Sequence, residues 1–508
     1  MNNPSTADRP VRDIVIVGGG TAGWMAAALF AKLLARDYRI RLIESDEIGT
    51  IGVGEATIPP IKNFNMALQL DEDDFIRKTQ GTFKLGIEFV DWGRLGDRYI
   101  HGFGRIGKDL GMVRCYQYWL RQRQLGLAPA LGEYSINTVA PRQGKFMRSR
   151  PDITNSPLAD ITHAFHFDAS LYARYLRQYS EARGVVRTEG RIVETRLRAD
   201  DGHIEGVLLA SGEQIAGDLY LDCSGSRGLL IEQALHTGYE DWSRWLPCDR
   251  AIAVPCESVQ PLLPITRSTA RRAGWQWRIP LQHRTGNGHV YSSRYMNEDE
   301  ATAILLTNLD GKAMAAPRMI PFLPGKRRQI WNRNCVAVGL AGGFLEPLES
   351  TSIHLIHSTL LRLLRLFPHR GYSAPETAQF NRAADFEYER IRDFIILHYK
   401  ANERDDSEMW RYCRHMEVPD TLSAKMELFR VNGRIVREND ELFTEENWLQ
   451  VMIGQNIMPQ GYDPLADLET PATIATFLGD IETVIRRCVA VMPTQRDFIA
   501  QFCAAEPL

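Results

Sequence analysis

A single lysine inside an apolar run is the first candidate for chemistry. Lys84 is flanked by Phe83 and Leu85, and Trp92 follows it closely in the sequence. In such surroundings an ammonium group would be partly desolvated and able to donate a hydrogen bond into a dry pocket. A lysine on the protein surface explains the same pattern equally well, so the sequence alone leaves both interpretations open.

An acidic turn beginning at Glu349 is the second candidate. Glu349 and Ser350 start a predicted helix with Ser350 as its N-cap, and the free N–H groups of Thr351 and Ser352 would point back toward a glycine turn. A helix end of this kind can hold a small anion without a formal positive charge. The alternative is an ordinary capped helix.

Two tryptophans form the third candidate. Trp275 and Trp277 lie two residues apart in the segment Gly274–Pro280, and this spacing places both indoles on one face of an extended strand. They predict either a wall of aromatic rings beside a ligand or a pair of core tryptophans.

The elements that would position these groups begin with a dinucleotide-binding pattern. A buried strand over residues 13–17 is followed by a glycine turn, an Ala-rich helix to about Leu34, and a second strand over 39–44. The glycines fit G-x-G-x-x-G, and an acid ends the second strand, where it can accept hydrogen bonds from a ribose. The residues predicted to bind the cofactor here are Gly18, Gly20, Thr21, Ala22, Gly23 and Glu44.

Two later strand-to-glycine turns, over 218–225 and 335–343, favour FAD over NAD. A long cofactor laid across a sheet needs several close approaches of the backbone. The predicted fold is therefore α/β, with a Rossmann-like FAD-binding module. We expect this module over residues 1–380, with inserted segments of a substrate chamber over about 57–165, and a mostly helical C-terminal part over 381–508.

Composition narrows the functional class. The 508 residues are 44% hydrophobic and have a formal net charge of -3, which allows a large core and provides no basic stripe for nucleic acid. The N-terminal residues show no signal peptide, and no run of 18 apolar residues predicts a membrane span, so we expect a cytoplasmic protein. The eight cysteines are scattered, which predicts free thiols rather than disulfides or a metal site.

Four segments together resemble the flavin-dependent tryptophan halogenase family. They are Gly274–Pro280, Phe83–Ile87, Phe344–Thr351 and Asp393–Lys400. The resemblance covers residues 13 to about 460 and implies an FAD-binding fold of the flavin monooxygenase type. It also implies that reduced FAD and oxygen oxidise chloride or bromide to hypohalous acid, which moves through the protein to a separate substrate chamber.

The resemblance assigns roles to individual residues. Lys84 matches the essential lysine that delivers the halogen, by a hydrogen bond or as a haloamine. Glu349 matches the essential glutamate that polarises the oxidant or stabilises the cationic ring. A lysine and a carboxylate would each help the other stay charged in an apolar chamber. The further matches are Thr351 and Ser352 for the halide, Val193, Leu340 and Ile353 for FAD, His101 and Phe103 for the aromatic substrate, and Trp275 and Trp277 as shields of the flavin.

Two departures from the family pattern bear on specificity. The halide turn Ser-Thr-Gly of the family reads Ser350-Thr351-Ser352 here, which leaves the preference between chloride and bromide open. Family members that take free tryptophan hold its backbone with a Tyr-Tyr pair and an acid near the C-terminus, and residues 445–450 show no such pair. We therefore expect indole or a larger indole derivative as the substrate, with Trp448 either stacked on its ring or part of the core.

The single glycine fingerprint predicts no NAD(P)H site in this chain. A separate NAD(P)H-dependent flavin reductase is therefore the expected source of reduced FAD, and the resemblance makes a homodimer an expectation. Two other functions stay open: a flavin monooxygenase that hydroxylates its substrate without halide, and a flavin-binding protein without turnover.

Overall fold

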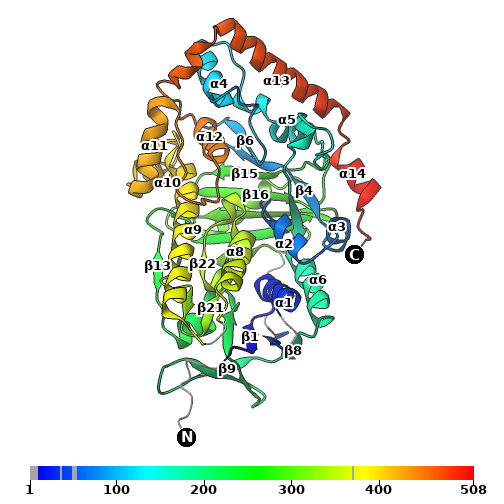
Figure 1. Ribbon diagram of the computed structural model, residues 1–508, viewed down its shortest axis with the longest axis vertical. Coiled ribbons are helices and arrows are strands. Elements are labelled where there is room, and N and C mark those ends of the chain that lie inside the picture. The colour runs from blue at the N-terminus through cyan, green and yellow to red at the C-terminus, as the bar shows by residue number, and fades with distance from the viewer. Residues whose placement is uncertain (1–9, 35–36, 48–53, 369–370, 508) are drawn as a thin grey trace.

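The computed structural model describes residues 10–34, 37–47, 54–368 and 371–507. The N-terminal nucleotide-binding part lies at one end of the elongated molecule, a broad sheet crosses its middle, and the later helices cover one side and the far end (Figure 1). This arrangement confirms the predicted α/β fold with a helical C-terminal part.

A six-stranded sheet carries the glycine turn. Neighbouring strands in it are parallel, except for the first pair. Ala26–Ala28 of α1 (Thr21–Leu33) are fully buried, and their small side chains let the helix approach the sheet closely. The order of the strands is β20 (Trp331–Asn332), β21 (Cys335–Ala337), β12 (Leu219–Asp222), β1 (Asp13–Val17), β2 (Arg39–Glu44) and β8 (Val186–Glu189).

A seven-stranded sheet forms the middle of the molecule. Its neighbours are antiparallel apart from one parallel pair, β15 with β5. The order is β18 (Arg318–Pro321), β14 (Arg250–Glu257), β17 (Arg284–Tyr291), β16 (Gly274–Pro280), β15 (Thr266–Arg271), β5 (Gly86–Val90) and β6 (Arg98–Gly102). A small sheet packs beside it, with the order β3 (Gly54–Ala56), β7 (Ala164–Asp168) and β4 (Thr82–Lys84).

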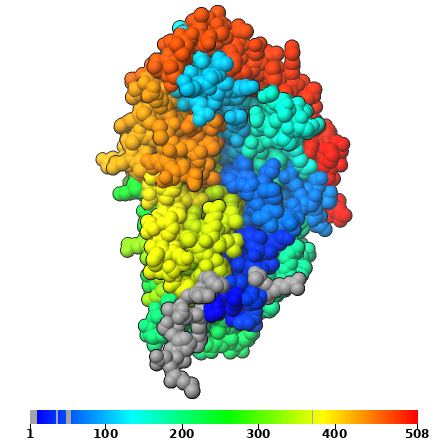
Figure 2. Space-filling model, in the orientation of Figure 1, coloured from blue at the N-terminus to red at the C-terminus, as the bar shows by residue number. Residues whose placement is uncertain are grey.

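The C-terminal part is helical, as predicted. Its helices pack against segments of residues 57–145, and Figure 2 shows the orange and red C-terminal residues beside the light-blue and cyan ones. The predicted boundary between the two parts, at residue 380, falls inside the first of these helices. It stays a prediction. The helices are α9 (Ala374–Lys400), α10 (Glu408–His415), α11 (Asp420–Asn432), α12 (Glu445–Gly454), α13 (Pro471–Val491) and α14 (Gln495–Phe502).

The remaining elements connect these layers. They are α2 (Ile61–Ala67), α3 (Glu72–Lys78), α4 (Cys115–Gln124), α5 (Ile136–Arg142), α6 (Ala169–Glu181), α7 (Glu298–Thr307), β9 (Ile192–Leu197), β10 (Ile204–Leu209), β11 (Gln214–Ala216), β13 (Tyr239–Asp241), β19 (Gly325–Arg327) and β22 (Gly343–Phe344). All eight cysteines are free thiols in the structure. Within the described ranges, every helix is too short or too polar to cross a bilayer.

One predicted helix boundary is wrong. Ser350 is not an N-cap, because α8 (Ser352–Arg365) begins two residues later, with Thr351 as its N-cap. Ser350 instead ends a short 3₁₀ turn, Pro347–Glu349, with a φ of 59° in the left-handed region. Non-glycine residues rarely adopt this conformation, and such residues cluster at functional sites.

Candidate active site

A cavity of about 780 Å³ opens at the carboxyl ends of β1 and β2. This is the edge at which open α/β sheets bind their ligands, and the volume lies in the range of ligand sites. Predicted cofactor residues on its wall include Gly18, Gly20, Thr21, Ala22, Glu44, Leu340 and Ile353.

The glycine turn fits a pyrophosphate group. α1 begins after Gly20 without a side-chain cap and without an acid in its first turn, so its N–H groups are suited to an anion. A Cβ atom on Gly20 would meet nothing within 4 Å, whereas one on Gly23 would lie 1.8 Å from the carbonyl oxygen of Gly18. Gly20 therefore keeps the cavity side open, and Gly23 allows the helix to pack on the turn.

Glu44 borders the same cavity at the end of β2. Its Oε1 atom forms ion pairs with Arg187 and Arg177. The other oxygen, Oε2, lies so close to Gly19 that a Cβ there would collide with it. The two ion pairs thus hold the carboxylate in place at the edge where the sequence predicts contact with a ribose.

Val193, unlike most of the predicted flavin residues, does not line the cavity. It is 51% exposed, and it is the preceding residue on β9, Ile192, that lines the cavity. Successive side chains on a strand point to opposite faces, so a difference of one residue moves the side chain away from the cavity.

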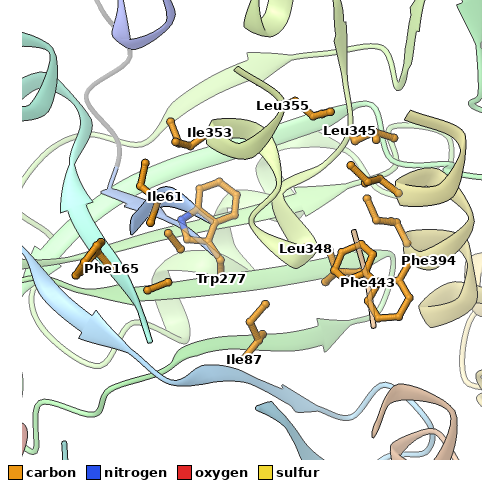
Figure 3. Close-up of a cluster of buried hydrophobic side chains, with 14 of the residues drawn as sticks. Ile61, Ile87, Phe165, Trp277, Leu345, Leu348, Ile353, Leu355, Phe394 and Phe443 are labelled. Carbon is orange, nitrogen blue, oxygen red and sulfur yellow. The ribbon is translucent and has the colours of Figure 1, made fainter. Parts of the chain in front are cut away.

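The two tryptophans lie on β16, as predicted, with ring centroids 6.1 Å apart. Trp277 borders the cavity, and Figure 3 shows its indole among Ile61, Ile353 and Leu348. Gly288 on the neighbouring strand makes room for this ring, because a Cβ there would come within 2.1 Å of it. The tryptophan segment therefore forms part of the cavity wall as well as part of the core.

Glu346 is a functional candidate that the sequence analysis did not single out. Its Oε2 atom accepts hydrogen bonds from Trp275 Nε1 at 2.9 Å and from the Tyr399 hydroxyl at 2.8 Å, while Oε1 is buried without a partner. Burial raises the pKa of this carboxyl to about 7, although the two hydrogen bonds oppose the shift. Its place three residues before Glu349 in the same motif was the available signal.

Lys84 is buried with no exposed surface, so the interpretation as a surface lysine is wrong. Its Nζ atom donates hydrogen bonds to the carbonyl oxygen of Thr57 at 3.0 Å and to Ser350 Oγ at 2.8 Å. Burial lowers the pKa of Lys84 to about 7, and the charge of Glu349 opposes this shift in part. The Phe103 ring lies 5.2 Å from the amine, as a predicted substrate wall would.

Ser350 connects this amine to the cavity. Ser350 lines the cavity, and its hydroxyl oxygen accepts a hydrogen bond from Lys84 Nζ. Ser352 lines the cavity as well, at the start of α8, whereas Thr351 lies fully buried between the two with an unpartnered Oγ1 atom. Ser350, in its left-handed conformation, therefore lies between the Lys84 amine and the cavity.

Glu349 does not use Lys84 as its direct partner, contrary to the paired arrangement that the sequence suggested. His101 Nδ1 lies 3.1 and 3.0 Å from its two oxygens, and His398 Nε2 lies 2.8 Å from Oε1. Burial opposes the charge of this carboxylate, but the two histidines outweigh it and hold the pKa at about 2. His398 lies in the predicted segment Asp393–Lys400, but no sequence pattern indicates that Glu349 is its partner.

Trp448 lies in the core. It is 1% exposed, its ring meets Phe394 edge-on at 4.8 Å, and Lys425 Nζ lies 4.5 Å from its centre. Phe443 stacks on the same Phe394 ring, at 3.8 Å, and Figure 3 shows these two phenylalanines side by side. Of the two roles left open for Trp448, the structure supports the core role in this conformation.

Comparison with known proteins agrees with this geometry. The family model described as tryptophan halogenase matches residues 13–471. The tryptophan 6-halogenase of Streptomyces toxytricini is 32% identical, over 96% of this chain and 97% of its own length. A flavin-dependent halogenase from Xanthomonas campestris has a TM-score of 0.95 and 48% identity, covering 98% of this chain and 100% of its own.

A second solved structure, a flavin-dependent halogenase from Brevundimonas sp. BAL3, has a TM-score of 0.93 and 46% identity, covering 97% of this chain and 99% of its own. These matches extend over both the nucleotide-binding part and the helical part. Together with the match over residues 13–471, they show that this chain belongs to the tryptophan halogenase family of flavin-dependent enzymes.

Proposed function

We propose that this chain forms hypohalous acid from chloride or bromide with reduced FAD and oxygen, and halogenates indole or a larger indole derivative rather than free tryptophan. The observation that carries the proposal is the position of Ser350. This residue borders the flavin cavity and accepts the hydrogen bond of the buried Lys84 amine. An oxidised halogen made in the cavity therefore has only one residue between it and the group that would deliver it.

The cofactor's binding residues are those of the cavity wall. The uncapped start of α1 at Gly20 and Thr21 would bind the pyrophosphate, Glu44 the ribose, and Trp277 and Ile353 the ring system. When bound and reduced, FAD would supply two electrons to oxygen, and the activated oxygen would then take two electrons from the halide, with release of water. A separate NAD(P)H-dependent flavin reductase would deliver the reduced cofactor.

The halide would bind at the start of α8. The helix begins without a side-chain cap, and the unpartnered Thr351 hydroxyl is a hydrogen-bond donor in a buried place. Both features favour a small anion. Ser352, which replaces the glycine of the family pattern, adds a side chain on the cavity side.

Lys84 would receive the oxidised halogen. With a pKa of about 7 a large fraction of its amine is neutral at neutral pH. A neutral amine reacts with hypohalous acid to form an N–halogen bond with loss of water, and an ammonium group donates a hydrogen bond to the same acid. In either case the amine holds the halogen at a fixed position, and a carbon of the aromatic ring then takes it.

Glu349 would stabilise the ring while it is positively charged. Because its pKa is about 2, this carboxylate stays ionised across the working range of pH. A fixed negative charge in a dry chamber favours a developing cation strongly. The same carboxylate can accept the proton that the ring loses when aromaticity returns.

The preference for indole over tryptophan is supported by the polar groups before and within α12. Glu441 is buried and accepts hydrogen bonds from Lys425, while Asn447 bonds Thr444 and His101. These groups are engaged within the protein rather than presented to the backbone of an amino acid. The names of the curated relatives point the other way, since they include tryptophan 6-halogenase and tryptophan 7-halogenase.

The test supplies a flavin reductase, NADH, FAD and oxygen, with chloride and bromide in separate reactions. Indole, tryptophan and small phenols serve as substrates, and mass spectrometry reads the isotopic pattern of the halogen. We expect halide-dependent product from indole at a higher kcat/KM than from tryptophan. Lys84→Ala should keep the yellow FAD-bound protein and lose the product, whereas Lys78→Ala, at an exposed lysine of α3, should retain it.

Three results would contradict the proposal in different ways. Hydroxylated product without halide, unaffected by Lys84→Ala, would identify a monooxygenase. FAD binding without product from any substrate would identify a binding protein. A clear preference for tryptophan over indole would leave the halogenase in place and overturn the substrate.

A further inference from the structure

We propose that Asn447 is a positioning residue that fixes His101 in the tautomer protonated at Nδ1, so that His101 donates its proton to the Glu349 carboxylate. The inference rests on the proposed function only for its kinetic test. It concerns a chain of side chains from α12 through β6 to the acidic turn.

The orientation of the Asn447 amide follows from the start of α12. Thr444 is the N-cap, and its backbone N–H donates to Asn447 Oδ1 at 2.7 Å, with the Thr444 hydroxyl 3.1 Å from the same oxygen. A backbone N–H is a donor only, so the oxygen of the amide must face Thr444. The amide nitrogen therefore faces His101, with Nδ2 2.8 Å from Nε2.

This contact determines which nitrogen of His101 carries the proton. An amide NH₂ group only donates, so His101 Nε2 must accept with its lone pair. The single proton of the neutral ring then lies on Nδ1, which is 3.0 and 3.1 Å from the two oxygens of Glu349. In the other tautomer, a lone pair would face the carboxylate and the hydrogen bond would be lost.

A second contact from the same helix places the backbone of His101 independently. Gln450, one turn after Asn447, accepts from the Gly102 N–H at 2.9 Å and donates to the Gly102 carbonyl at 3.0 Å. Gln450 thus holds the backbone of β6 at Gly102, the residue after His101. The role left for Asn447 is the choice of the protonated nitrogen.

The opposite side of Glu349 shows why this choice is specific to His101. His398 Nδ1 donates to the Phe394 carbonyl at 2.9 Å, and its Nε2 faces Glu349. The partner of its Nδ1 atom is the main chain of α9, which side-chain replacement leaves in place. Lys84 and Tyr99 are the other titratable groups that act on Glu349. Of the two histidines, only His101 has the ring nitrogen that faces away from Glu349 bound to a side chain.

The kinetic test is a double-mutant cycle between positions 447 and 101. Asn447→Leu keeps a similar size without the donor, and we expect kcat for indole halogenation to fall about tenfold or more. His101→Asn provides a substitute N–H at the place of Nδ1 that needs no partner to orient its proton. In the His101→Asn background, Asn447→Leu should therefore cost less than about twofold. Gln450→Met removes the contacts to Gly102 and a hydrogen bond to the Glu446 carbonyl within α12 but none of the contacts of Asn447, so it should lower kcat by the same factor in both backgrounds.

The structural test uses the cofactor-free protein labelled with ¹⁵N at histidine. We expect Nε2 of His101, assigned by its loss in His101→Asn, to be unprotonated in the wild type at pH 8. Asn447→Asp presents an acceptor in place of the donor and should move the proton to Nε2, and it provides a second variant if Asn447→Leu does not fold. A wild-type ring protonated at Nε2, an unchanged tautomer in Asn447→Asp, or an additive cycle would overturn the inference.

The two tests separate this inference from the proposed function. If the wild type makes no halogenated indole but shows the expected tautomer and its reversal, the positioning role stands and the proposed reaction fails. If halogenation occurs and the tautomer is the opposite one, the reaction stands and the positioning role fails.

Discussion

Replacing Lys84 with methionine should change how stability depends on pH. The amine has no exposed surface, and burial lowers its pKa from 10.5 to about 7. Because the folded-state pKa lies below the unfolded one, the unfolded chain binds more protons between these values. The free energy of unfolding of the wild type therefore gains from this group as the pH rises from about 7 toward 10.5, and the buried ammonium is penalised in full below pH 7.

The magnitude follows from the two pKa values. At about 1.36 kcal/mol per pKa unit, the lowering from 10.5 to about 7 corresponds to a cost of about 5 kcal/mol while the amine is charged. Integrated from pH 6 to pH 9, about 2.7 kcal/mol of this cost disappears. Methionine also leaves the Thr57 carbonyl and the Ser350 hydroxyl without their donor, at about 1–3 kcal/mol each, but this loss does not depend on pH.

The measurement is urea unfolding of cofactor-free wild type and Lys84→Met at pH 6, 7, 8 and 9. The stability of the variant minus that of the wild type should fall by about 2.7 kcal/mol across this range. Lys326→Met is the matched control, because Lys326 is also buried but has Glu240 and Asp385 as ion-pair partners. It should be less stable than the wild type at all four pH values. A difference for Lys84→Met that is constant or grows with pH would refute the desolvated amine.

Two further substitutions test the acidic turn. Glu349→Gln keeps the size and loses the charge, so kcat should fall on the order of a hundredfold or more, with FAD affinity by fluorescence unchanged; a variant that keeps a tenth of the rate would contradict the electrostatic role. Ser352→Gly restores the open backbone of the family pattern and removes a side chain from the cavity wall, so bromide should gain relative to chloride in a competition between the two halides. If the variant gives the same ratio of brominated to chlorinated product as the wild type, Ser352 lies outside the halide site.

Much of the nucleotide-binding fold is legible in the sequence. The strands over 13–17 and 39–44 have the predicted bounds, and α1 ends at Leu33, one residue before the prediction. Here an apolar run, a glycine turn and a helical pattern follow one another within about thirty residues. Local interactions are therefore enough to predict these strands and this helix. The same local argument fails at Ser350, because nothing in a serine side chain predicts a left-handed residue between a 3₁₀ turn and the start of α8.

The register of a single strand shows a second limit. The resemblance assigns Val193 to the flavin site, but Ile192 faces the cavity and Val193 faces away. Which face of β9 meets the cavity depends on how the β9–β11 sheet packs against the nucleotide-binding part. That packing brings together residues far apart in the chain.

The sequence by itself determined the family and the dinucleotide-binding module and, through the family resemblance, singled out Lys84 and Glu349 as candidates, because motifs of adjacent residues carry that information. The tertiary structure alone decided the charge states of those side chains. The pKa of Lys84 depends on its complete burial. The pKa of Glu349 depends on His101, 248 residues earlier in the chain, and on His398, 49 residues later. Desolvation and hydrogen bonding act through space, so no window of sequence contains the partners that set them.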